Sequence, residues 1–328
     1  MKIGLTLAIV TYNRPIKLNR CINSVSKQTV LPDKVLVIDN DTNKTAKEVV
    51  SRYKSKLPIT YLLESKKGTP HARNKALSEN KSEFICFVDD DCTLDIFWVR
   101  NALKIIKKTK QKNPAFIVGK SKLLNKHNIY AQAQFATYRR WFVTQINQKD
   151  QLATPEALDT KNVILNFGVI KKHQLSFDTK YSEFNTSGFE DIDLGLQLTK
   201  LGYFGKYDPH LTISHEEVDN FKQMVHKAFQ RGQLKYYLCQ KWTSVDDLIL
   251  NLNTQTSTGL FQRVKKICQS IIKTLKVLFK QNKSLKSKLA TQRKIILMEI
   301  INQAFCQGFS YQEREGELKT KLAKKKER

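Results

Sequence analysis

The sequence contains few of the residues that mark repetitive, disulfide-linked or membrane-spanning proteins. Glycine occurs only 12 times and proline 7 times in 328 residues, which excludes a collagen-like or low-complexity chain. The six cysteines are scattered and form no Cys-x-x-Cys pair, so they indicate buried thiols in a reducing compartment and not a disulfide framework or zinc site. Neither a run of about 18 uncharged apolar residues nor a signal-peptide cleavage site is found, so we expect a cytoplasmic protein.

Acidic residues are scarce relative to basic ones. Lys and Arg together number 57 against 30 Asp and Glu, which gives a net charge of +27. This excess favours a polyanionic neighbour, such as nucleic acid, an anionic membrane surface or a phosphorylated ligand. No helix-turn-helix, zinc-finger or RNP pattern supports the first of these, so nucleic-acid binding is kept as an alternative hypothesis only.

Short apolar runs alternate with helical patterns through the first hundred residues. The expected strands are Thr6–Val10, Val35–Ile38, Ile59–Leu63 and Phe84–Val88, with a later one at Val163–Ile170. The expected helices are Ile16–Lys27, Thr45–Lys54, Pro70–Asn80, Trp98–Lys112 and Ile192–Leu201. Repeated β-α units of this kind predict an α/β domain with a mostly parallel sheet, which binds its ligands beyond the carboxyl ends of the strands.

Three consecutive aspartates, Asp89, Asp90 and Asp91, follow the expected strand 84–88. Their carboxylates repel one another, so ionising all three requires a nearby cation. Mg²⁺ and Mn²⁺ prefer carboxylate oxygens and commonly bridge a protein to a diphosphate. An acidic turn that caps the next helix would give the same pattern, but the position after a buried strand favours a metal site.

Two further polar segments follow expected strands at the same edge of the sheet. Asp39 and Asn40 come after the strand 35–38, where a side-chain oxygen can accept from a ribose hydroxyl or a base N–H, although an Asx turn explains the same residues. Residues 11–14 end the first strand, where a dinucleotide-binding fold has Gly-x-Gly-x-x-Gly. The absence of that motif argues against an NAD-dependent dehydrogenase.

Three weaker signals lie further along the chain. Arg73 is near the start of an expected helix, where it either contacts an anion or lies on a solvated face. Glu190 and Asp191 open another helix, either as partners of the helix dipole or as a general base for an attacking hydroxyl. His215 follows a short apolar strand and is either a metal ligand or a satisfied buried histidine.

Together these segments resemble glycosyltransferase family 2, whose members are inverting enzymes that use nucleotide sugars and have the GT-A fold. The resemblance covers roughly residues 5–220 and rests on five segments in matching order and spacing: Val10–Pro15, Val37–Asn40, Gly68–Asn74, Phe87–Asp91 and Gly188–Leu194. The sequence departs from the family pattern at Asn40, where many members have an aspartate that reads uracil, and at Gln197 and Leu198, where an arginine is common.

The resemblance implies roles for individual residues. The nucleotide sugar would be bound by Thr11, Tyr12, Arg14, Asp39, Asn40, Arg73, Asp89 and Asp90. Mg²⁺ or Mn²⁺ would be held by Asp89, Asp91 and His215. The catalytic residues would be Asp191, as the base, and its neighbour Glu190.

The composition changes from about residue 243. Residues 240–328 carry 19 Lys and Arg against 7 Asp and Glu, and so +12 of the net charge. Apolar residues recur at helical spacing over 260–280 with lysines between them, which is typical of a membrane-surface helix or of a helix packed on the catalytic domain. A second apolar helix is expected at Ile295–Phe305. We therefore expect a GT-A catalytic domain over residues 1–240 and a basic, amphipathic helical region over 241–328.

These observations predict an inverting glycosyltransferase that moves a sugar from a nucleoside diphosphate, expected to be UDP, to a hydroxyl of a glycan or lipid-linked acceptor in cell-surface polysaccharide synthesis. The acceptor and the basic region would place it at the inner face of an anionic membrane, and no nucleic acid is expected as a partner. A degenerate transferase that only binds glycans is disfavoured because all the acidic motifs are retained.

Overall fold

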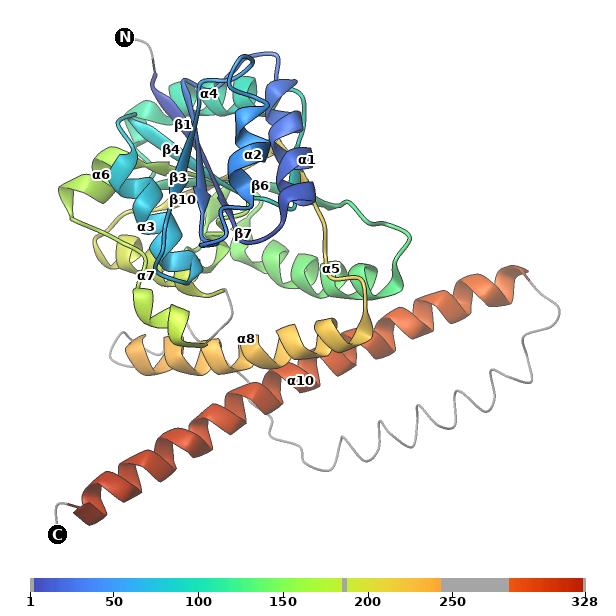
Figure 1. Cartoon of the computed structure of the whole chain (residues 1–328). Helices are drawn as coiled ribbons and strands as arrows, with labels where there is room; N and C mark the ends of the chain where they lie inside the picture. Colours follow the sequence, from blue (N-terminus) through green and yellow to red (C-terminus); the bar gives the residue numbers. More distant parts are fainter. Residues whose placement is uncertain (1–2, 185–187, 243–282, 327–328) are drawn as a thin grey trace. The chain divides into compact units, whose positions relative to one another are not determined.

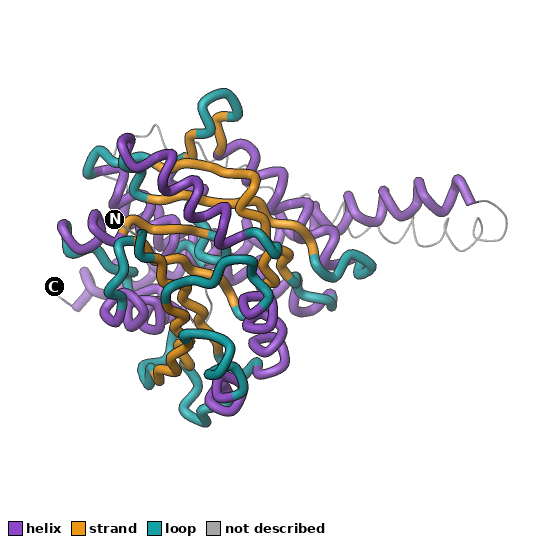
Figure 2. The backbone as a smooth tube through the Cα atoms, turned by 90° about the horizontal axis from the view of Figure 1, so that it is seen from above, coloured by secondary structure: helices purple, strands orange, loops and turns teal. Residues whose placement is uncertain are grey.

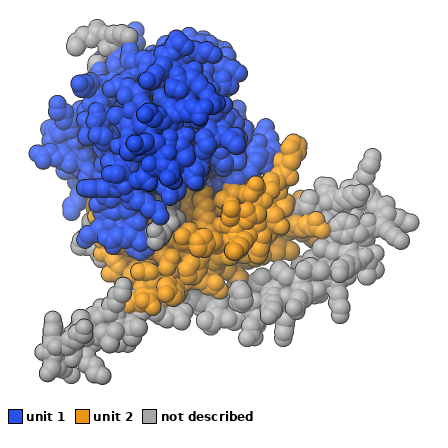
Figure 3. Space-filling view, viewed as in Figure 1, with its two compact units in different colours: residues 1–126, 138–217 blue, residues 127–137, 218–328 orange. Residues whose placement is uncertain are grey.

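The computed structural model describes residues 3–184, 188–242 and 283–326, which belong to two compact units (Figures 1 and 3). Unit 1 comprises residues 1–126 and 138–217, and unit 2 comprises residues 127–137 and 218–328. Residue 240, the domain boundary expected from the sequence, lies within helix α8 (Phe221–Trp242) of unit 2.

Unit 1 is built on one sheet whose neighbouring strands are β3-β2-β1-β4-β9-β6-β10-β8-β7, with β5 pairing to β10. The strands are β1 (Leu5–Thr11), β2 (Lys34–Asp39), β3 (Ile59–Leu63), β4 (Phe84–Asp89), β5 (Cys92–Leu94), β6 (Phe116–Leu123), β7 (Ile146–Asn147), β8 (Leu152–Ala153), β9 (Val163–Asn166) and β10 (Gly205–His215). The first four in spatial order run parallel, as do β6 and β10, whereas β9 is antiparallel to both β4 and β6. The mostly parallel α/β sheet predicted from the sequence is confirmed.

Helices cover both faces of this sheet, which is why its central strands are almost continuously apolar (Figures 1 and 2). They are α1 (Pro15–Ser26), α2 (Ala46–Ser51), α3 (Thr69–Glu79), α4 (Trp98–Thr109), α6 (Phe167–Lys172) and α7 (Glu190–Lys200). Leu7 and Ile9 of β1 pack into one core with α1, α2 and α4, while Ala8 between them packs into the other core with α3 and α7. Alternation along a strand thus fills two cores from one β-strand.

The strand predicted over residues 163–170 is wrong in its second half. Strand β9 ends at Asn166, whose side chain accepts a hydrogen bond from the Val169 N–H and caps helix α6. A short apolar run fits a buried strand and a buried helix equally well, so periodicity alone does not separate them. The capping asparagine decides the outcome.

Unit 2 is helical in the residues that the structure describes. It contains the first part of α5 (Ile129–Phe142), then α8 and α10 (Lys283–Lys326), which pack through Ala133, Met224, Ala228, Ile301 and Ala304. The helix predicted at 295–305 is confirmed as part of α10. The basic amphipathic stretch 260–280 lies outside the described residues.

Helices α8 and α10 cross at two glycines. A Cβ added to Gly232 of α8 would lie 1.9 Å from the carbonyl oxygen of Phe305, and one added to Gly308 of α10 would lie 1.8 Å from that of Phe229. The two backbones therefore approach more closely than any side chain would allow. Within the described part of the chain, no helix combines the length and the hydropathy needed to cross a bilayer.

Candidate active site

The candidate site lies in unit 1, at the carboxyl ends of the parallel strands. Strands β1, β4 and β10 end here in Thr11, Asp89 and His215, and helix α7 brings Glu190 and Asp191. Because parallel strands deliver their carboxyl ends to one edge, residues distant in sequence meet here.

The middle aspartate of the triplet ties two strands together. Thr11 Oγ1 donates to Asp90 Oδ2 over 2.7 Å, and Arg14 Nη1 lies 3.2 Å from both Asp90 Oδ1 and Asp91 Oδ2. Burial raises the pKa of Asp90 to about 6, against the opposing charge of Arg14. Thr11 and Arg14 are therefore both bonded to Asp90, while Tyr12 is half exposed (50%).

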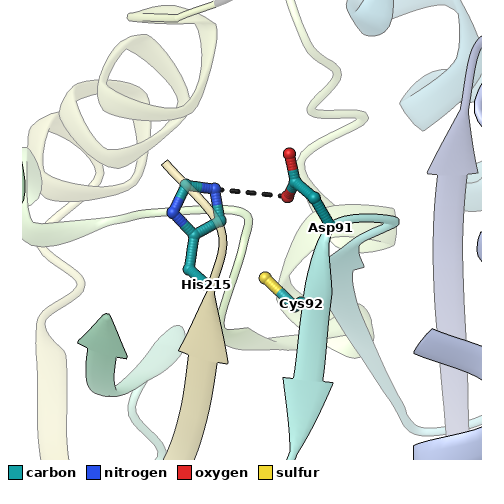
Figure 4. A group of neighbouring side chains, drawn as sticks. All are labelled: Asp91, Cys92 and His215. Carbon is teal, nitrogen blue, oxygen red and sulfur yellow. Dashed lines mark ion pairs between the residues drawn. The ribbon is translucent and has the colours of Figure 1, made fainter. Parts of the chain in front are cut away.

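The third aspartate belongs to a group that could hold a metal ion. Ligand atoms of Asp91, Cys92 and His215 lie within 4.8 Å of one another (Figure 4). His215 Nε2 is 3.2 Å from Asp91 Oδ1, and its Nδ1 is 3.1 Å from Glu217 Oε1. Burial disfavours the charged imidazole, but the carboxylates of Glu217 and Asp91 raise the pKa of His215 to about 9. Asp89, also predicted as a ligand, is outside this group.

The donor set fits a divalent cation. A carboxylate oxygen and an imidazole nitrogen suit Mn²⁺. Burial raises the pKa of the Cys92 thiol, and its Sγ donates to the Lys161 carbonyl, so this third member of the group, which the sequence analysis did not select, is a poor ligand for that ion. His215 has a carboxylate behind its second ring nitrogen, as metal-binding histidines commonly do.

Arg73 connects the aspartate triplet to helix α7. It is buried, with Nη2 3.5 Å from Asp89 Oδ1 and Nη1 in an ion pair with Glu190 Oε1. Its guanidinium also lies 5.7 Å from the ring centroid of Phe177. Glu190, only 1% exposed, accepts in addition from the Gly188 N–H. The negative charge of Glu190 is therefore balanced by the guanidinium of Arg73 inside the protein.

Asp191, the adjacent acid, has a different environment. It is partly exposed; Oδ1 accepts from the Ile192 N–H, and Oδ2 accepts from both the N–H and the hydroxyl of Thr160, each over 3.4 Å. Burial, reinforced by the carboxylates of Glu190 and Asp159, raises the pKa of Asp191 to about 7. An aspartate with this pKa can accept a proton at neutral pH.

Asp39 directs its carboxylate into the protein. Oδ2 accepts from the Ala46 N–H (3.0 Å) and the Tyr61 hydroxyl (3.2 Å), and Oδ1 accepts from the Asp41 N–H (3.1 Å). Asp39 is fully buried and holds the start of helix α2 beside strand β3.

Asn40 also bonds to the backbone. Its amide donates to the carbonyls of Glu64 (2.9 Å) and Lys66 (2.8 Å) and accepts from the Gly68 N–H (2.8 Å). These bonds fix the loop that leads into helix α3. Gly68 has φ +128°, a conformation that favours glycine.

The turn over residues 159–162 was missed by the sequence analysis. Asp159 and Lys161 form a partly buried ion pair, the Lys161 ammonium lies 3.8 Å from the Tyr138 ring centroid, and Thr160 contacts the candidate base. No sequence motif marks this turn, because its residues approach Asp191 only when the chain folds. An aspartate, a threonine and a lysine in a loop are otherwise ordinary surface composition.

The chain is similar to known glycosyltransferases in sequence. The model of "Glycosyl transferase family 2" matches residues 6–162. The chain is 23% identical to a hyaluronan synthase of Pasteurella multocida over 66% of its own length and 25% of that protein's. It is 24% identical to the O-antigen chain rhamnosyltransferase WbaN of Salmonella anatum, over 74% of each chain.

A solved structure shares the fold. The mannosyltransferase PcManGT from Pyrobaculum calidifontis, in complex with GDP-Man and Mn²⁺, matches with a TM-score of 0.63 at 13% identity. The match covers 95% of this chain and 87% of that one. The chain spans only a quarter of the hyaluronan synthase but about three quarters of the rhamnosyltransferase.

Proposed function

The chain belongs to glycosyl transferase family 2, and from that premise we propose that it is an inverting enzyme that transfers a sugar from a nucleoside diphosphate to a hydroxyl of a glycan or lipid-linked acceptor. Cell-surface polysaccharide synthesis is the context proposed, since the printed names of the relatives concern hyaluronan and O-antigen chains.

One observation carries this proposal. Two adjacent carboxylates have different partners. Glu190 forms an ion pair with buried Arg73, whereas Asp191 is partly exposed and has a pKa of about 7. Two acids whose environments differ in this way can be assigned different roles. Asp191 suits a general base, and Glu190 suits a residue that holds Arg73 in place.

The chemistry follows from these residues. Asp191 accepts the proton of the acceptor hydroxyl as its oxygen forms a bond to the anomeric carbon. The bond from that carbon to the diphosphate oxygen breaks on the opposite face, and the leaving group takes the electron pair, which inverts the configuration. A divalent cation bound by Asp91 and His215 would stabilise charge on the diphosphate. Arg73 adds a fixed positive charge beside Asp89.

The finer assignments are also part of the proposal. We propose Mn²⁺ or Mg²⁺ as the ion and UDP as the nucleotide, with GDP as the competitor because the mannosyltransferase of the same fold holds GDP-Man. Thr11, Tyr12, Arg14, Asp39, Asn40, Asp89 and Asp90 are proposed to form the donor site, of which Asp39 and Asn40 act by shaping its walls. Peripheral binding to the inner face of an anionic membrane is proposed for the basic region.

Donor binding provides the test. A thermal-shift panel of UDP-, GDP- and dTDP-sugars, with and without Mn²⁺, should show stabilisation by one nucleotide that requires the ion. Asp91→Ala should abolish the Mn²⁺-dependent part of the stabilisation. The control Asp150→Ala, which removes an exposed carboxylate that accepts from the Asn147 side chain, should not. Equal response of Asp91→Ala and the unmodified protein to nucleotide and Mn²⁺ would refute the metal site.

A further inference from the structure

The turn over residues 159–162 is held rigidly by its last residue. The Asn162 N–H closes the turn by donating to the Asp159 carbonyl over 3.0 Å. Asn162 Oδ1 accepts from the Trp98 indole N–H (2.9 Å), and its amide donates to the Leu211 carbonyl (2.8 Å). The Asn162 carbonyl in turn accepts from the Gly119 N–H (3.1 Å). A buried asparagine with these four bonds anchors the turn to β6, β10 and α4.

The second residue from the start of the turn faces the candidate base. Thr160 is only 2% exposed, and both its N–H and its hydroxyl lie 3.4 Å from Asp191 Oδ2. On either side, Asp159 and Lys161 pair with each other, which limits rotation of the turn. Thr160 therefore presents two donors from a fixed backbone to one carboxylate oxygen.

The charges around Asp191 make these donors significant. Glu190 on the same helix and Asp159 on the turn disfavour its ionised form, and Arg73 on α3 favours it. A donor hydrogen bond also favours the ionised form. Thr160 supplies this without adding a charge that would bind the acceptor or the diphosphate.

We propose that Thr160 is a positioning residue for Asp191, which orients the carboxylate toward the acceptor hydroxyl and keeps it ionised. The inference rests on the proposed function, in which Asp191 is the general base. Thr160 itself touches no reacting atom in this assignment. The other oxygen, Oδ1, accepts from the Ile192 N–H and keeps a second lone pair for the proton.

A pH–rate profile of the full chain tests the inference. Thr160→Val replaces the hydroxyl by a methyl group and should raise the pKa of Asp191. We therefore expect the acidic limb of the kcat profile to shift to higher pH by roughly 0.5–1 pH unit. Thr160→Ser should restore the limb of the unmodified enzyme. Thr109→Val is the matched control, because it removes a buried hydroxyl that donates to the Ile105 carbonyl on α4 and should leave the limb unmoved.

A second measurement does not depend on turnover. Because the lost bond stabilises the ionised carboxylate, the destabilisation caused by Thr160→Val should be larger above pH 7 than below it, as measured by urea unfolding. A pH-independent loss of stability together with an unmoved limb would overturn the inference and leave Thr160 a packing residue. If the unmodified enzyme transfers no sugar but the pH-dependent destabilisation is found, the proposed function has failed while the contact to Asp191 stands.

Discussion

At the scale of single residues, the partner of a carboxylate decides what it can do. Asp90 is bonded to Thr11 and Arg14, Glu190 is paired with Arg73, and Asp191 is held by neutral donors. All are acids at the same edge of the sheet. Their different partners leave Asp191 as the acid best suited to gain and lose a proton near neutral pH.

Exchanging the two adjacent acids for amides should have unequal effects. Asp191→Asn removes the proposed base and should lower kcat by about 10²–10⁴ with donor binding nearly unchanged. Glu190→Gln leaves Arg73 without its buried ionic partner, so its main effect should be on stability. Turnover that survives Asp191→Asn but collapses with Glu190→Gln would reverse the assignment. Single-turnover kinetics would measure the chemical step in both variants, and calorimetric titration would measure their donor binding.

The pKa of Asp191 also predicts how activity depends on pH. Its value in the folded protein is raised to about 7 from 3.8, so the base is ionised above pH 7 and protonated below it. Turnover should therefore fall as the pH is lowered through about 7, and not through about 4 as for an ordinary aspartate. A profile flat down to pH 5 would contradict this.

Glu217 should support metal binding through His215. Its carboxylate lies 3.1 Å from His215 Nδ1, so Glu217→Ala frees the ring to rotate and should weaken Mn²⁺ binding about 10–100-fold. Electron paramagnetic resonance of free Mn²⁺ would measure this. Glu216→Ala is the control, because that carboxylate pairs with Lys17 and Arg20 and is not bonded to the histidine. Equal Mn²⁺ affinity in the two variants would contradict the role of Glu217.

At the scale of elements, two helices of unit 2 depend on the absence of side chains where they cross. The carbonyls of Phe305 and Phe229 occupy the space that side chains at Gly232 and Gly308 would fill. Glycine inside a helix normally lowers its stability by about 1 kcal/mol relative to alanine. The close approach of two backbones explains why both helices tolerate it.

Gly232→Ala should therefore destabilise unit 2 despite the better helix propensity of alanine. Overpacking at a tight contact costs about 1–3 kcal/mol, which should appear as a lower urea midpoint of unfolding. Cys306→Ala, on the exposed side of α10, should change the midpoint little. A midpoint for Gly232→Ala equal to that of the unmodified chain would show that the helices separate readily.

The elements also show how far the sequence could predict the structure. Alternating apolar runs and helical patterns predicted the β-α units of the sheet because β1, β2 and β4 are buried on both faces. The second half of 163–170 was mispredicted because the cap at Asn166 has no periodic signature. The contact of Thr160 with Asp191, 31 residues away, was not predictable, since it arises only when α7 packs against residues 155–157, just before the turn. The position of Cys92 beside Asp91 and His215 was not predicted, because a lone cysteine carries no spacing pattern.

At the scale of the whole molecule, the net charge of +27 predicts attraction to anionic surfaces. Binding of the full chain to liposomes should rise with the anionic lipid fraction and fall with salt. Changing Lys265, Lys266, Lys273, Lys276 and Lys280 to Gln should abolish flotation if the stretch 260–280 is the contact. Changing Lys47, Lys54, Lys56, Lys104 and Lys107 of unit 1 to Gln is the matched control. Equal loss in both variants would make the attraction a property of total charge and not of this stretch.

Unit 2 is built from two segments, 127–137 and 218–328, that are far apart in the sequence, and this affects how it forms during synthesis. Ala133 of unit 2 leaves the ribosome long before its packing partners, because Met224 and Ile301 lie far downstream. Translation of residues 133–301 takes roughly 10–30 s at about 5–20 residues per second. During that interval the apolar side of residues 129–137 has none of its described partners on α10 available, so a nascent chain stalled before α10 is the form most in need of a chaperone.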